Sequence, residues 1–194
     1  MFSDLLRREL GSVAELTAAQ AAALEAHYEL LVRWNRTVNL TSIRTLEEAV
    51  QRHYCESLFL GAHLQPGALR IADIGSGAGF PGIPVAVLRP DCHVSLIESH
   101  QRKAVFLREA CRNLANVRVC AARAEDLREA FDVAISRAVS YRDLAPSLMR
   151  IAPNADLLTG AEEPPEGIGF VWQPGIRLPW GSQRFLRKGH RIGD

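Results

Sequence analysis

The sequence has few cysteines and no long apolar segment. Its 194 residues include four cysteines, Cys55, Cys92, Cys111 and Cys120, and none has the CxxC spacing of a zinc site. The N-terminus mixes charged with apolar residues, unlike a signal peptide, and no apolar run approaches the ~20 residues that span a bilayer. These absences exclude a disulfide-stabilised secreted scaffold and predict a cytoplasmic protein with no metal and no membrane contact.

An excess of charge of one sign is also missing, because 23 basic residues face 22 acidic ones. No field of the whole molecule therefore draws it to a polyanion, which would have to bind a local patch. The end of the chain offers a phosphate-binding patch in which Asp194 is the only acid, although a solvated tail is an equal alternative. Its basic residues are Arg177, Arg184, Arg187, Lys188 and Arg191.

Residues 1–65 are expected to form an N-terminal helical region packed on the core. From Thr17 to Asn35, apolar residues recur every three or four positions, and Thr17 with Gln20 makes a capping box. A second helix is predicted from Thr45, with Glu48 as its capping partner, to Gly61.

Beyond residue 66, short apolar runs alternate with helical stretches. The predicted strands are 69–74, 94–97, 117–120 and 131–135, and the predicted helices are 81–88, 102–113 and 141–150. The tail adds shorter strands at 156–158, 168–172 and 183–186. This alternation predicts an α/β, Rossmann-like fold over 66–194, with a mostly parallel twisted sheet flanked by helices.

The segment from Asp73 to Gly82, DIGSGAGFPG, closes the first predicted strand and opens a helix. Gly77, Gly79 and Gly82 fit GxGxxG, so an NAD(P)-dependent oxidoreductase is a rival interpretation. Asp73 favours S-adenosylmethionine, because an acid repels a pyrophosphate but attracts the sulfonium and ammonium of that cofactor. The alternative is that Asp73 only caps the end of the strand.

Two further acidic segments come after the next predicted strands. Glu98 stands nineteen residues after Gly79, where a carboxylate accepts hydrogen bonds from both ribose hydroxyls of a cofactor, unless it is a solvated helix cap. After the third strand, backbone amides and a carboxylate in Ala124-Glu125-Asp126-Leu127 are placed to read an adenine edge, and a simple helix cap is equally compatible with this pattern.

A protein that uses S-adenosylmethionine is expected to transfer its methyl group. The residues after the fourth predicted strand indicate which kind of atom accepts it. The chain has no Pro-Cys pair for carbon-5 methylation of a pyrimidine, and residues 135–139 lack the Asn/Asp-Pro-Pro-aromatic loop used on exocyclic amines. A ring nitrogen such as guanine N7 already offers a lone pair and needs neither a nucleophile nor a general base. Arg137 is then placed either to orient the base or to pair with a nearby acid.

The chain resembles the RsmG (GidB) family of bacterial 16S rRNA guanine-N7 methyltransferases, which have the class I methyltransferase fold. The segments that carry the resemblance are 34–43, 52–58, 73–84 and 136–138. It implies S-adenosylmethionine contacts at Gly75, Phe80, Ala124, Glu125 and Arg137, with Asp73, Gly77 and Glu98 lining the same pocket. It also implies 16S rRNA or the small ribosomal subunit as partner, and we expect a monomer.

Two departures from the family pattern are visible. Glu56 replaces the usual Asp after His53, which lengthens the carboxylate side chain, and Thr159 stands where a Lys usually precedes Gly160. Trp34 and His53 are also compatible with simple core roles. A protein that binds S-adenosylmethionine without turnover stays a further alternative.

Overall fold

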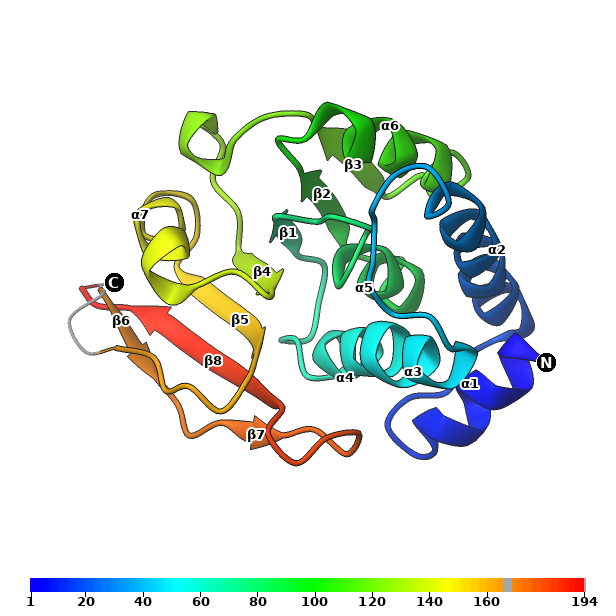
Figure 1. The fold of residues 1–194 in the computed structure, drawn as a ribbon. Helices are drawn as coiled ribbons and strands as arrows, with labels where there is room; N and C mark the ends of the chain where they lie inside the picture. The colour runs from blue at the N-terminus through cyan, green and yellow to red at the C-terminus, as the bar shows by residue number, and fades with distance from the viewer. Residues whose placement is uncertain (166–168, 194) are drawn as a thin grey trace.

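The computed structural model describes residues 1–165 and 169–193, in which helices cover both faces of one sheet (Figure 1). The helices are α1 (Phe2–Leu10), α2 (Ala18–Trp34), α3 (Leu46–Ala49), α4 (Glu56–Ala62), α5 (Gly82–Leu88), α6 (Gln101–Ala110) and α7 (Tyr141–Ile151). The strands are β1 (Arg70–Ile74), β2 (His93–Ile97), β3 (Val117–Cys120), β4 (Val133–Arg137), β5 (Asn154–Thr159), β6 (Phe170–Trp172), β7 (Ile176–Arg177) and β8 (Phe185–Arg191). A π-helical segment, Val50–Cys55, joins α3 to α4, and a 3₁₀ turn, Ala124–Asp126, follows β3.

The strand order is β3-β2-β1-β4-β5-β8-β6, and β7 pairs with β8. Strands β1 to β5 run parallel, whereas β8 is antiparallel to β5, β6 and β7. From β1 the order proceeds outward in both directions, so the chain reverses its course between β1 and β4. Open α/β sheets bind ligands at the carboxyl ends of the strands beside such a reversal. The predicted fold class is therefore confirmed, and the edge where β1 and β4 end is the expected position of a site.

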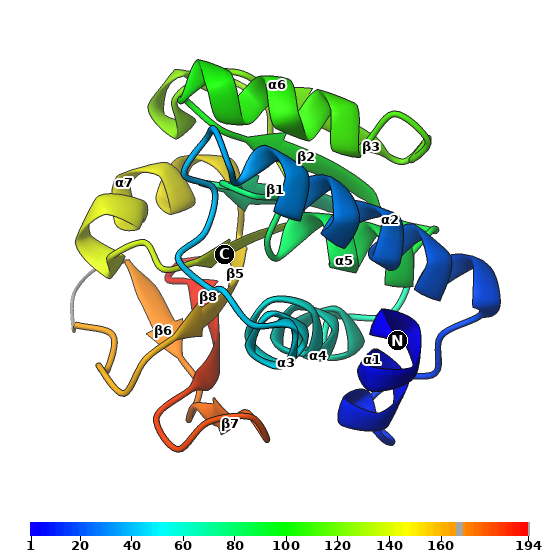
Figure 2. The ribbon, with the colours of Figure 1, turned by 45° about the vertical axis from the view of Figure 1, so that its right-hand side comes forward.

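Each face of the sheet has its own apolar core. On β1, Ile71 packs in the core that includes α2, α4, α5 and α6, whereas Ala72 packs in the core that includes α7. Figure 2 shows α2 between α5 and α6 on one side of the molecule, with α7 apart from them. The alternation of neighbouring residues between these cores follows from the two-residue period of a strand.

The helices before β1 belong to the larger of these cores. Phe2 of α1 stacks on Tyr28 of α2 with ring centroids 5.0 Å apart, and meets Tyr54 edge-on at 4.9 Å. As predicted, residues 1–65 contain only helices and turns, although α1 was not predicted as a separate helix. The division of the chain into two units at residue 65 stays a prediction.

The capping signals identified both helix starts in this region. Thr17 and Gln20 form the predicted reciprocal capping box, and the Thr45 side chain accepts from the backbone N–H of Glu48. The helix predicted from Thr45 to Gly61, however, consists of α3, the π-helical segment and α4. A π turn contains an extra residue and changes which side chains face the core, and apolar spacing does not reveal it.

Several predicted bounds were wrong. Pro81 was expected in the first helical turn, but α5 begins one residue later, and the helix predicted over 102–113 ends at Ala110. The strand predicted over 131–135 runs instead over Val133–Arg137 (β4), and the one predicted over 183–186 runs over Phe185–Arg191 (β8). Ile168, in the strand predicted over 168–172, lies outside the described residues. Apolar periodicity locates the middle of an element better than its ends.

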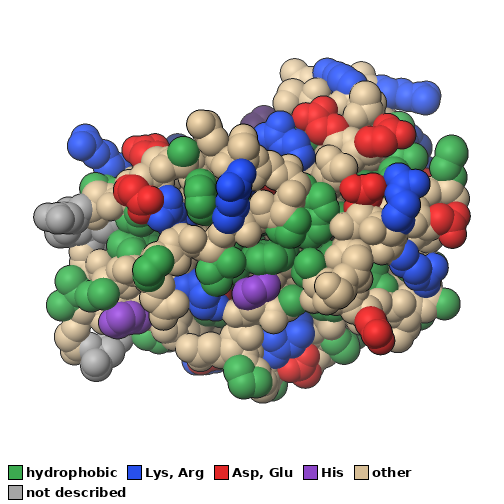
Figure 3. All heavy atoms as spheres, turned by 90° about the horizontal axis from the view of Figure 1, so that it is seen from below, with side chains coloured by type: hydrophobic (Ala, Val, Ile, Leu, Met, Phe, Trp, Pro, Cys, Tyr) green, Lys and Arg blue, Asp and Glu red, His purple; other side chains and the backbone are tan. Residues whose placement is uncertain are grey.

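The surface carries both signs of charge. Basic and acidic side chains are interspersed over the face shown in Figure 3. This agrees with the nearly equal numbers of the two kinds in the sequence. In the part of the chain that the structure describes, no helix is long and apolar enough to cross a membrane.

A buried hydrogen-bonded chain connects the N-terminal helices to the loop after β1. His27 on α2 is 3 % exposed, and its Nε2 lies 3.1 Å from the Ala78 carbonyl. Because that carbonyl can only accept, Nε2 carries the proton, and Nδ1 accepts from the Tyr54 hydroxyl at 2.9 Å. Burial lowers the pKa of His27 to about 4, so the ring stays neutral at neutral pH.

We expect His27 to make the fold sensitive to acid. The unfolded state takes up a proton near pH 6.5 and the folded state near pH 4, so this contribution to stability is complete above pH 6.5 and is lost as the pH falls toward 4. In His27→Gln, the free energy of unfolding in urea should fall less steeply between pH 6.5 and 4.5, by up to about 1.4 kcal/mol per pH unit. Tyr54→Phe is the control. It removes the hydroxyl but keeps the imidazole, so the free energy of unfolding should fall with pH as steeply as in wild type. Equal slopes in wild type and His27→Gln would contradict this assignment.

Candidate functional site

The glycine loop, residues 75–82 between β1 and α5, is built on left-handed backbone. Gly75, Gly77 and Gly79 have φ of 72°, 56° and 88°, a region that side chains with a Cβ rarely adopt. The backbone N–H groups of Gly75 and Ser76 both donate to the Ile97 carbonyl at the end of β2, at 2.9 and 3.1 Å. The loop therefore turns sharply off the sheet and stays tied to the neighbouring strand.

The loop combines one crowded position with one open one. A Cβ on Gly82 would come within 2.5 Å of Asp73 Oδ2, so only glycine allows α5 to start against this carboxylate. A Cβ on Gly77 would meet only the Gly75 carbonyl, at 3.8 Å. The space beside Gly77 is thus free for a ligand to approach the backbone.

Asp73 lies at the end of β1 with no exposed surface. Its Oδ2 accepts the backbone N–H of Gly82 at 3.0 Å, while its Oδ1 is buried and has no hydrogen-bond partner among the described residues. Burial raises the pKa of this carboxyl to about 7. Asp73 therefore holds the start of α5 rather than only the end of its own strand, and one of its oxygens lacks a donor among the described residues.

Glu98 joins two loops at the end of β2. The side chain is 7 % exposed, Oε2 accepts the N–H of Gly77 at 2.9 Å, and Oε1 accepts the N–H of His100 at 2.7 Å. Each carboxylate oxygen has a second lone pair, so both remain able to accept a hydroxyl. The carboxylate is thus held beside Gly77 by the glycine loop itself.

The end of β3 lies at the same edge of the sheet. Glu98 donates its backbone N–H to the Cys120 carbonyl at 3.1 Å, and the 3₁₀ turn with Ala124 and Glu125 begins four residues later. Ala124 is half-buried and accepts from the Arg150 guanidinium of α7 at 2.7 Å, whereas the Glu125 side chain is exposed. The structure places both residues just beyond the end of β3, with the Glu125 side chain open to solvent.

Arg137 ends β4 and points toward the N-terminal helices. One of its terminal nitrogens donates to the Arg52 carbonyl at 2.6 Å, and Cζ lies 5.2 Å from the centre of the Phe80 ring. Burial lowers the pKa of this guanidinium to about 10, so it remains charged at neutral pH. The next residue, Ala138, has φ of 61°, which costs a non-glycine residue about 1 kcal/mol or more. Such strain is concentrated at functional sites.

Phe80 is the centre of an aromatic cluster rather than an open stacking surface. The side chain is 2 % exposed and stacks on His53, with ring centroids 4.4 Å apart and an interplanar angle of 10°. Tyr54 meets it edge-on at 5.1 Å. The ring thus packs the helices against the glycine loop.

Glu56 makes a well-formed ion pair despite its additional methylene. The side chain is fully buried, and its two oxygens accept from Nε and a terminal nitrogen of Arg184 at 3.0 and 2.6 Å. This bidentate contact joins α4 to the residue before β8.

The phosphate-binding patch expected at the end of the chain does not form as a free cationic surface. Arg187 pairs with Glu163, and Lys188 donates to Asp156 at 2.7 Å. With Arg184 also engaged, three of the predicted phosphate ligands are neutralised within the chain; Arg177 is exposed, and Asp194 lies outside the described residues.

The sequence did not identify three residues that shape this site. Arg52 contributes through its backbone carbonyl, so its side-chain type carries no signal. His27 and Tyr54 lie among the apolar residues of their helices. Since buried polar groups are hydrogen-bonded, their position among apolar neighbours was the one sign in the sequence that they form a structural hydrogen bond.

Comparison with known proteins relates the chain to one family. A family model described as rRNA small subunit methyltransferase G matches residues 20–153. The chain is 48% identical over 128 residues to ribosomal RNA small subunit methyltransferase G of Xanthomonas axonopodis pv. citri, covering 64% of this chain and 59% of that protein. The same enzyme of Chromobacterium violaceum is 44% identical over 140 residues, which cover 70% and 66%.

Solved structures share the fold at low identity. A SAM-dependent methyltransferase from Aquifex aeolicus superposes with a TM-score of 0.59 at 15% identity, over 75% of this chain and 93% of that one. Methanococcus jannaschii fibrillarin, a pre-rRNA processing protein, gives 0.55 at 17% identity, over 68% and 70%.

The match covers only part of the relatives but most of this chain. The chain spans about 59% of the length of the Xanthomonas relative. The family model nevertheless covers more than half of the 194 residues and includes every site position from Asp73 to Arg137. On that match, the chain belongs to the rRNA small subunit methyltransferase G family.

Proposed function

We propose that the protein transfers a methyl group from S-adenosylmethionine to N7 of a guanine in 16S rRNA of the small ribosomal subunit. The observation that carries this proposal is the contact between the Glu98 carboxylate and the N–H of Gly77, which holds an acid beside the open part of the glycine loop. Membership in the family and the shared methyltransferase fold support it.

The cofactor is expected at the carboxyl edge of β1, β2, β3 and β4. Two buried acids, Asp73 and Glu98, flank the glycine loop there, which suits a ligand carrying a sulfonium and an ammonium and disfavours the pyrophosphate of NAD(P). The Oδ1 of Asp73 has no hydrogen-bond partner among the described residues. The residues assigned to the cofactor are Asp73, Gly75, Gly77, Gly79, Phe80, Glu98, Ala124, Glu125 and Arg137.

The chemistry needs alignment more than acid or base catalysis. S-adenosylmethionine supplies an electrophilic methyl group, and the N7 lone pair forms the new N–C bond as the S–C bond breaks, so no proton is transferred. The positive charge passes from the sulfonium to the methylated guanine. The protein must therefore hold the two reactants in line, which is a task for fixed hydrogen-bond donors.

Arg137 is the residue that we assign to this alignment. Its guanidinium is fixed by the Arg52 carbonyl through one nitrogen, which leaves further N–H groups for the carboxylate of the donor or the O6 edge of the guanine. The strained Ala138 directly after it supports a functional position.

The expected setting follows from the substrate. Small-subunit rRNA, free or assembled, is in the cytoplasm, and we propose that the protein acts there as a monomer without a metal ion. The test is incubation with labelled S-adenosylmethionine and small-subunit rRNA or particles, followed by nucleoside mass spectrometry for N7-methylguanine. Label on another atom would overturn the N7 assignment, and a protein that binds the cofactor without any transfer would favour the non-catalytic alternative.

Glu98→Ala should weaken S-adenosylmethionine binding about 10-fold or more, because two charge-assisted hydrogen bonds to the ribose are lost and the glycine loop is released. Calorimetry measures the affinity, and NAD serves as the competing ligand. Glu129→Ala, which removes an exposed acid paired with Arg118, should leave the affinity unchanged. Unchanged binding in Glu98→Ala, or binding of NAD by wild type, would argue against this cofactor site.

Arg137→Ala should lower kcat/KM for rRNA about 100-fold or more, equivalent to roughly 3 kcal/mol of transition-state stabilisation. Arg137→Lys should restore little of it, since an ammonium cannot reproduce the planar fork that bonds the Arg52 carbonyl and the substrate together. Single-turnover methylation is the measurement, with urea unfolding to verify that the variants fold. A near-normal rate in folded Arg137→Ala would remove this residue from the mechanism.

A further inference from the structure

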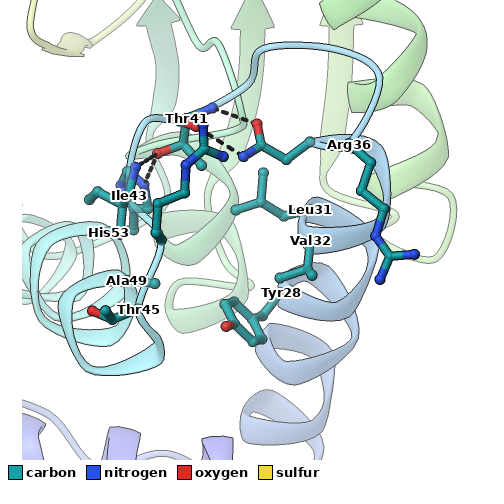
Figure 4. Close-up of a pocket in the computed structure, with 11 residues that line it drawn as sticks. Tyr28, Leu31, Val32, Arg36, Thr41, Ile43, Thr45, Ala49 and His53 are labelled. Atoms are coloured by element: carbon teal, nitrogen blue, oxygen red, sulfur yellow. Dashed lines mark hydrogen bonds between the residues drawn. The ribbon is translucent and has the colours of Figure 1, made fainter.

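A second pocket, here called the helical pocket, lies between α2 and the segment that leads to α4. It is lined by Tyr28 and Val32 of α2, by Arg36, Thr41 and Arg44 of the following loop, and by His53 of the π-helical segment. In Figure 4 the labelled side chains of α2 face Thr41, Ile43 and His53 across the hollow. None of the residues assigned to the cofactor lines it.

The polar side of the helical pocket is preformed. Asn35 accepts the N–H groups of Leu40 and Thr41 at 2.8 and 3.0 Å, and its amide nitrogen donates to the Thr41 carbonyl at 2.9 Å. The Thr41 hydroxyl in turn accepts the N–H of Ile43 at 3.1 Å. Because the loop satisfies its own backbone, a ligand would bind without the cost of ordering it.

One polar group in this wall lacks a partner. His53 is 5 % exposed, and its Nε2 lies 2.8 Å from the Thr41 hydroxyl. Its Nδ1 is buried with no hydrogen-bond partner within the described residues. A buried polar atom is rarely left unpaired, since this costs as much as a lost hydrogen bond, so the wall of the helical pocket contains a polar group that is not satisfied by the described residues.

The rim of the helical pocket combines charge with apolar surface. The guanidinium groups of Arg36 and Arg44 are exposed, and within the described ranges neither has a hydrogen bond or an ion pair. The nearby acid Glu48 is already paired with Arg52 at 3.1 Å. Val32, which lines the pocket together with Tyr28, is 43 % exposed. Nucleotide-binding sites have this composition, because guanidinium groups bind the phosphate and an apolar or aromatic wall packs against the base.

The helical pocket also adjoins the proposed reaction site. His53, which lines it, stacks on Phe80 at 4.4 Å, and Arg137 lies over the same Phe80 ring at 5.2 Å. We infer that the helical pocket binds a nucleotide of the RNA substrate next to the acceptor guanine. This inference rests on the proposed function, and it assigns a substrate contact to the N-terminal helices rather than to the end of the chain.

The double variant Arg36→Ala/Arg44→Ala should weaken binding of small-subunit rRNA about 10-fold or more near 0.1 M salt. If both guanidinium groups contact phosphates, the slope of log affinity against log salt should fall by about 1.4. Affinity for S-adenosylmethionine should be unchanged. Arg7→Ala/Arg112→Ala removes two exposed arginines that do not line the pocket and is the matched control for charge.

Val32→Glu should weaken rRNA binding to a similar extent by placing a carboxylate at the rim, whereas Val105→Glu, at a 49 % exposed valine of α6, should not. Normal rRNA affinity in both pocket variants would overturn the inference, as would equal losses in the matched controls. If wild type binds rRNA through the helical pocket but transfers no methyl group, the pocket is still an RNA-binding site and only the proposed methyl transfer fails.

Discussion

The hydrogen bond from His27 to the Ala78 carbonyl holds a loop that has few side chains of its own. Three glycines give the loop after β1 its left-handed turns, and the same freedom would let it adopt many other shapes. The neutral imidazole, oriented by Tyr54, restrains it from the side of α2, and the stacking of His53 on Phe80 adds a second restraint. A loop with few side chains thus takes its rigidity from helices that precede it in the chain.

Charged side chains around the site are held by fixed hydrogen-bond partners. Glu98 accepts two backbone amides, Glu56 is matched by both arms of Arg184, and Arg137 is held by a carbonyl. Groups held in this way need little reorganisation, which suits the proposed displacement, in which charge moves from one reactant to the other. Asp73 is the exception, since one of its oxygens has no donor among the described residues.

The sequence was sufficient for the features that are local. Apolar spacing and turn residues predicted the alternation of strands and helices, and the glycine loop with Asp73 and Glu98 was found because a short motif follows a strand. Contacts between distant positions gave no such signal. His27 and Ala78 are 51 residues apart, and the partner of Glu56 could not be foreseen because an ion pair depends on the path of the whole chain.

The π-helical segment and the tail were missed for different physical reasons. A π turn has no residue preference strong enough to show in a single sequence, yet it sets how the Arg52 carbonyl meets Arg137. In the tail, clustered basic residues indicated a phosphate site, but acids from three separate elements neutralise Arg184, Arg187 and Lys188. Net charge along a sequence does not show which charges remain free once the chain has folded.

The pairing of Glu56 with Arg184 bears on the order of events during synthesis. The two residues are 128 positions apart, and a ribosome adding about 5–20 residues per second makes the second roughly 6–25 s after the first. Throughout that interval the carboxylate has no guanidinium to accompany it into the interior, and burying it alone would be too costly. Helix α4 is therefore expected to pack in its final position only after Arg184 has been made.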